Sequence, residues 1–115
     1  MDRVKYARDD AGRATSLAHW KWGSRRELAV GAEPVRSSEA IDEHLVFVQT
    51  TETVHFRMGG EDVVASTADP KLGGGAVYAF PRAAGETHLS AVLAADADGG
   101  EARLEYWLGD RFVEV

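Results

Sequence analysis

The chain has 115 residues, enough for one domain with a single core, and a net charge of −6 from 13 Lys and Arg against 19 Asp and Glu. This acidic balance disfavours nucleic acid as a partner, because the phosphate backbone would be repelled. No apolar run is long enough to span a bilayer, no apolar segment follows the first charged residues, and there is no cysteine. We therefore expect a cytoplasmic protein without membrane contact or disulfide bonds.

Short stretches that favour strands, separated by turn residues, follow one another along the chain, and no helical periodicity is sustained. An Asp-Asp-Ala-Gly turn at 9–12 predicts a hairpin near the N-terminus, and Gly109-Asp110 predicts a second one near the C-terminus. The predicted strands cover residues 4–8, 14–22, 27–30, 44–49, 54–58, 76–80, 88–95, 103–108 and 111–115. This pattern predicts an all-β barrel or double-sheet sandwich.

Residues 73–88, GGGAVYAFPRAAGETH, carry the most specific signal in the chain. Three glycines precede an apolar strand, Pro81 ends its pairing, and Gly85 turns the chain before His88. Gly75 is followed by five residues and Pro81, and Gly85 is followed by two residues and His88. This spacing resembles the second motif of the cupin family, G-x5-P-x-G-x2-H-x3-N, with two extra residues before Gly85 and Val92 in place of the asparagine.

The resemblance extends over residues 28–95, including the strands around 43–48 and 54–61, and it implies a double-stranded β-helix, or jelly-roll barrel. On this basis we expect one domain over residues 1–115. Residues 1–27 would form an N-terminal hairpin extension, 28–95 the cupin core, and 96–115 a C-terminal hairpin.

In cupins, two histidines and a glutamate of the first motif bind a divalent metal together with the last histidine. In this chain only Glu43 and His88 match those ligands, and Glu39 is the available third. Imidazole supplies most of the affinity of such sites, so the sequence predicts no tightly bound cofactor. A weak divalent-metal site on Glu39, Glu43 and His88 is the alternative.

The resemblance also indicates where a ligand would lie. His88 is expected to face the cavity as the acid or base, with Glu43 orienting it. Phe47 and Gln49 would point inward with Glu43, because side chains alternate along a strand. Other ligand contacts are expected from Trp20, Trp22, Tyr78 and Ser90, whereas His55 is expected at the surface. Trp20 and Trp22 share one face of their strand, where a core or dimer contact is the alternative role.

Three functions follow as hypotheses. The first is a barrel that binds a small organic ligand, with metal-independent isomerase, epimerase or cyclase chemistry. The second is a metal-dependent dioxygenase or lyase with an altered ligand set. The third is a non-catalytic protein-binding or immunity protein, which a packed interior without a cavity of about 300 Å3 would favour. We also expect a homodimer, because residues 44–48 are apolar on both faces and need cover outside the barrel.

Overall fold

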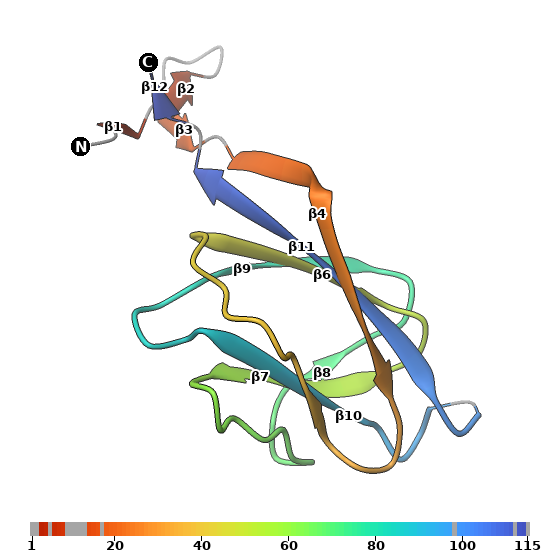
Figure 1. Cartoon of the computed structure of the whole chain (residues 1–115). Helices are drawn as coiled ribbons and strands as arrows, with labels where there is room; N and C mark the ends of the chain where they lie inside the picture. Colours follow the sequence, from red (N-terminus) through yellow and green to blue (C-terminus); the bar gives the residue numbers. More distant parts are fainter. Residues whose placement is uncertain are drawn as a thin grey trace.

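The computed structural model describes the backbone of residues 3–4, 6–8, 14–16, 18–97, 99–111 and 113–114, and the side chains of 20–97 and 99–110. Across these residues the secondary structure is entirely β, which confirms the predicted class (Figure 1). The strands are β1 (Arg3–Val4), β2 (Tyr6–Arg8), β3 (Ala14–Ser16), β4 (Ala18–Val30), β5 (Val35–Arg36), β6 (Leu45–Thr50), β7 (Val54–Gly59), β8 (Lys71–Leu72), β9 (Val77–Pro81), β10 (His88–Leu93), β11 (Ala102–Arg111) and β12 (Val113–Glu114). None of the described segments is a helix long and apolar enough to cross a membrane.

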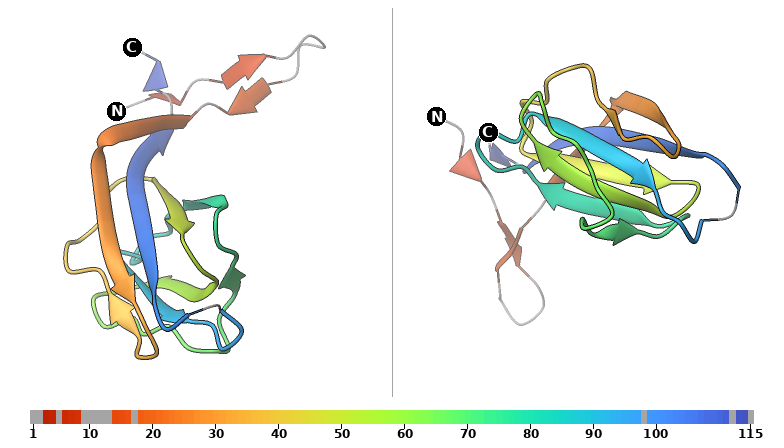
Figure 2. Two further views of the ribbon diagram at one scale, coloured as in Figure 1. Left: turned by 90° about the vertical axis from the view of Figure 1, so that its right-hand side faces the viewer. Right: turned by 90° about the horizontal axis from the view of Figure 1, so that it is seen from below.

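Eight of these strands form two antiparallel four-stranded sheets. The first sheet has the order β4-β11-β6-β9 and the second has the order β5-β10-β7-β8. The pairing is nested, because β4 pairs with β11, β5 with β10, β6 with β9, and β7 with β8. The chain between β4 and β11 thus runs out and back as one antiparallel ribbon. Its successive strand pairs alternate between the two sheets, which face each other (Figure 2).

A single apolar core lies between the two sheets. Cross-strand partners share a face, so the register fixes which residues point inward. In the first sheet, Val46 pairs with Leu108 and Val48 with Tyr106, and all four are buried. The corresponding inward residues of the second sheet include Val54, Phe56, Leu89 and Ala91.

The segment between β7 and β8, residues 60–70, covers the outer face of the second sheet. Val63 and Ala65 in this segment are buried. The Ala65 N–H donates to the Ser90 hydroxyl at 2.9 Å, and the Ser90 hydroxyl donates to the Val35 carbonyl at 2.7 Å. The outer face of this sheet therefore packs against its own chain.

Strand β4 is longer than the sequence predicts, and it contains a bulge. The predicted strands 14–22 and 27–30 are replaced by β3 and the continuous strand β4, in which residues 22–25 lie opposite Trp107 alone. The Ser24 hydroxyl accepts the Leu108 N–H at 2.8 Å and so replaces part of the interrupted ladder. The pairing of β2 with β3 agrees with the predicted hairpin turn at 9–12, but residues 18–27 belong to the first sheet and not to a separate N-terminal extension.

The predicted turn at Gly109-Asp110 is wrong. Strand β11 runs through both residues, with Gly109 paired to Trp20 and to Leu45. A glycine between two neighbouring strands is tolerated here because β11 is an inner strand held on both sides. The segment after residue 96 therefore supplies a central strand of the first sheet instead of a separate hairpin.

Candidate functional site

His88 points away from the space between the sheets, contrary to the prediction. It pairs with Gly59 at the start of β10, while its neighbours Leu89 and Ala91 belong to the core. His88, Ser90 and Val92 share the outer face of the second sheet. Leu89 and Ala91 bury more apolar surface in the core than His88 would, and this favours the observed register of β10. Because adjacent residues of a strand point to opposite faces, His88 then points outward.

Ser90 and His55 have structural roles on that outer face. Ser90 is fully buried and holds the 60–70 segment and β5 through the two hydrogen bonds given above. The prediction that His55 is a surface residue is wrong, because it is 5% exposed and its Nδ1 lies 2.9 Å from the Asp69 carbonyl oxygen. Alternation correctly separated His55 from the core face, but it gave no sign that a loop covers the opposite face.

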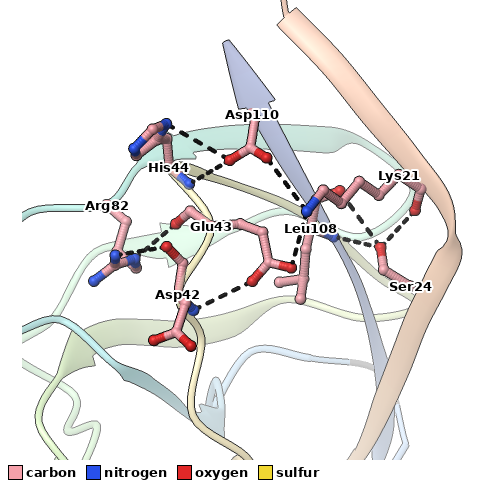
Figure 3. Close-up of polar contacts among 8 residues, drawn as sticks. All are labelled: Lys21, Ser24, Asp42, Glu43, His44, Arg82, Leu108 and Asp110. Carbon is pink, nitrogen blue, oxygen red and sulfur yellow. Dashed lines mark hydrogen bonds and ion pairs between the residues drawn. The ribbon is translucent and has the colours of Figure 1, made fainter. Parts of the chain in front are cut away.

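Glu43 lies in a cluster of charges at one end of the first sheet (Figure 3). The Lys21 ammonium lies 3.5 Å from the Glu43 carboxylate and 3.3 Å from that of Asp110. The hydrogen bond from Lys21 to Asp110 is the main cause that raises the pKa of Lys21. Burial would raise the pKa of Asp110, but hydrogen bonds from the His44 N–H and Lys21 outweigh it and lower that pKa. Glu43 is therefore part of an ion pair with Lys21 in this structure.

The predicted catalytic and metal-ligating residues are held by separate partners. Glu39 pairs with Arg26 at 3.2 Å, Glu43 pairs with Lys21, and the His88 Nδ1 lies 2.9 Å from the Thr87 hydroxyl. No interaction found within the described part of the chain joins Glu43 to His88. In the same residues, no group of three or more His, Cys, Asp or Glu is placed to hold a metal ion. The structure therefore does not assemble the set Glu39, Glu43 and His88.

Phe47 and Gln49 lie on the outer face of the first sheet, so the prediction that they point inward is wrong. The inward residues of β6 are Val46, Val48 and Thr50. Phe47 instead stacks on Trp20, with 4.1 Å between ring centroids, and Trp20 stacks on Trp22 at 5.2 Å. Trp20 and Trp22 thus share a face, as predicted. We call this surface, formed by Trp20, Trp22, Phe47 and Trp107, the aromatic face.

Tyr78 does point inward, as part of a row of rings on β9. Its hydroxyl accepts the Gly73 N–H at 2.9 Å, and its ring lies 6.4 Å from that of Phe80. Phe80 stacks in turn on Phe56 of the opposite sheet at 5.0 Å. This hydrogen bond connects the glycine run before β9 to the row of rings.

A pocket of about 260 Å3 opens where this row of rings reaches the edge of the sandwich, between β9 and the second half of β7. Strand β8 has only two residues and pairs only with Val54 and His55, so it leaves that half of β7 at the edge. Pro70 and Pro81 flank the opening, and neither can donate to a strand ladder. We call this the edge pocket. It is lined by Phe56, Arg57, Met58, Asp69, Pro70, Leu72, Phe80, Pro81 and Glu86.

The charged side chains of the edge pocket are already engaged within the chain. Arg57 lies 3.5 Å from the Asp69 carboxylate, which also accepts the Ser66 N–H at 2.8 Å. Glu86 accepts the Ala83 N–H at 2.8 Å. These groups can orient a ligand at the rim, while the floor of the pocket is apolar.

Sequence reasoning did not identify the edge pocket. The alternation of Val54, Phe56 and Met58 did predict an apolar face on β7. The missing information was the length of β8, which depends on tertiary packing.

Comparison with protein-family models, with curated proteins and with solved structures gives no match for this chain. We therefore infer the function of the protein from the geometry of its own residues.

Proposed function

We propose that this protein is a cupin-like jelly roll that binds a small apolar or aromatic molecule in the edge pocket. The nested strand pairing supports the jelly-roll part of the proposal, since a jelly roll is an antiparallel ribbon of eight strands wound into two sheets. The mouths of β-barrels are common ligand sites. A cytoplasmic location remains part of the proposal, and the absence of cysteine is compatible with it.

The observation that carries the proposal is an opening onto inward-facing rings of both sheets. Phe56 comes from the second sheet and Phe80 from the first, and their stacked rings line the same pocket. A flat apolar molecule can extend this stack and bury its surface against Met58 and Leu72. Few polar groups at the rim and an apolar floor are typical of small-molecule sites.

The volume limits the size of the ligand. Drug-sized ligands occupy pockets of about 300 to 1,000 Å3, whereas a cavity of about 150 Å3 holds benzene. The edge pocket, at about 260 Å3, suits one ring or two fused rings. It is smaller than the cavity of about 300 Å3 whose absence was expected to favour a protein-binding role, so the small-molecule proposal is limited to ligands of one or two rings.

The proposal is for binding and not for turnover. His88 faces the opposite side of its sheet, Glu43 is engaged with Lys21, and neither residue lines this pocket. Arg57, Asp69 and Glu86 are engaged as described above. Binding therefore has more support than the isomerase, epimerase or cyclase chemistry inferred from the family resemblance.

Thermal melting with indole and with cyclohexanol tests the proposal. A ligand that binds only the native state raises the melting temperature in proportion to the logarithm of its concentration. We expect indole to have the larger effect, because its flat rings can stack on Phe80. In Phe80→Leu, the increment from indole should fall toward that from cyclohexanol.

Phe47→Leu is the matched control, since it removes a buried ring that does not line the edge pocket. It should lower the melting temperature of the free protein but keep the increment from indole. The proposal would be contradicted by no increment in the parent protein, or by equal losses in both variants.

A further inference from the structure

The aromatic face has an exposed end. Trp22 is 76% exposed although one side of its ring stacks on Trp20, and Val77 on the same side of the sheet is 51% exposed. Trp107 lies beside Trp20 with 5.5 Å between ring centroids. An exposed Trp ring at the end of a row of stacked rings marks an interaction site more often than an isolated exposed residue does.

The charges beside these rings balance. Arg25 lies 2.6 Å from Glu27 and 3.0 Å from Glu105, and Arg103 lies 3.3 Å from Glu105. These four groups are the charged side chains on the outward positions of the described parts of the first sheet. Two cations and two anions leave this face neutral on a chain of net charge −6.

We propose that the aromatic face is the interface of a homodimer, in which a second copy of the chain packs against it about a two-fold axis. Two copies that met through any acidic part of the surface would repel each other. A neutral face that carries both signs is complementary to itself, because Arg25 of one copy can lie against Glu27 or Glu105 of the other. The exposed side of the Trp22 ring can then stack on apolar surface of the partner.

The position of the rings suits this arrangement. Trp20 and Trp22 lie on β4, an edge strand of the first sheet, while Phe47 lies on β6, two strands further in. Residues 60–70 cover the outer face of the second sheet. Among residues 20–97 and 99–110, no segment covers the outer face of the first sheet in this way. This inference does not depend on the edge pocket, which lies at the other edge of the sandwich.

Sedimentation equilibrium of the full chain tests the proposal. At about 100 µM, a concentration at which even a micromolar interface is saturated, we expect a mass of twice 12.5 kDa. Trp22→Glu should yield a monomer, because it places a charge of the same sign in the apolar part of the interface on each copy. Trp22→Phe, which keeps an aromatic ring, should remain dimeric.

Two further variants make the result specific. Arg103→Glu leaves the rings intact but gives the face a net charge of −2, and it should weaken the dimer at least tenfold, with partial recovery at high salt. Val64→Glu alters another exposed apolar residue, on the segment that covers the second sheet, and should leave the dimer unchanged. Far-UV circular dichroism checks that each variant is folded. A monomeric parent protein, or a folded Trp22→Glu variant that remains dimeric, would overturn the proposal.

Discussion

The Lys21 ammonium lies 3.3 Å from the Asp110 carboxylate and joins β4 to β11. The same carboxylate accepts the His44 N–H at 3.1 Å, just before β6 begins. Asp110 thus holds three neighbouring strands of the first sheet at one end. The interaction explains why β11 continues through Gly109-Asp110, since Asp110 finds its partners only when the strand stays in the sheet.

Asp110→Asn should destabilise the protein in a pH-dependent way. The pKa of Asp110 is lowered in the folded protein, so its stabilisation is present above the unfolded value of about 3.9 and is lost as the pH falls through the folded pKa. We expect a loss of about 1 kcal/mol at pH 7 and a smaller loss at pH 3. Urea unfolding at the two pH values measures both, with the exposed Asp62→Asn as the control. An equal loss at both pH values would show that the charge of Asp110 is irrelevant.

Replacing His55 should destabilise the protein more than replacing His88. This is the reverse of what an inward His88 and a surface His55 would give. His55→Ala removes a buried ring and leaves the Asp69 carbonyl without that partner, so it should cost about 1 to 3 kcal/mol. His88→Ala affects a partly exposed side chain bonded to its neighbour Thr87 and should cost less than about 1 kcal/mol. Urea unfolding at one pH compares them directly. A larger cost for His88→Ala would contradict its outward, partly exposed placement.

Gly74 should be intolerant of any side chain. A Cβ at this position would lie 2.7 Å from the Thr51 carbonyl oxygen, so the backbone of one loop would have to move. We expect Gly74→Ala to cost about 1 to 3 kcal/mol, as overpacking does. Gly23→Ala is the control, because its Cβ would meet no atom within 4 Å. If both substitutions are neutral, the glycine run before β9 does not hold that loop against the turn after β6.

The fold class and most of the central strands could be predicted from the sequence, because alternation and turn residues are local signals. Predicted strands 44–49, 54–58, 76–80 and 88–95 agree with β6, β7, β9 and β10 to within two residues. The prediction of a turn at Gly109-Asp110 was wrong because tertiary contacts of Asp110 override the local turn preference. The sequence did not predict the bulge in β4 for a similar reason, since it depends on the hydrogen bond between Ser24 and Leu108, which are 84 residues apart.

The candidate site was less predictable, because it depends on which face of each strand is buried. In β6, residues 45–49 are apolar at four of five positions, so either face could be inward. The structure buries Val46 and Val48 in the core and uses Phe47 on the outer face. In β10, the cupin-like motif predicted an inward His88, but the burial of Leu89 and Ala91 in the core places His88 on the outer face. One residue of register decides all of these assignments.

The most direct test of ligand binding in the edge pocket uses the methionine methyl groups. The chain has two methionines, Met1 and Met58, and Met58 lines the pocket. With 13C-labelled methionine methyls, titration with indole should shift the Met58 signal along a saturable curve, and Met58→Leu assigns that signal. The Met1 signal should not move. A Met58 signal that stays fixed at millimolar indole, or moves in step with that of Met1, would contradict the proposal that this pocket binds small aromatic molecules.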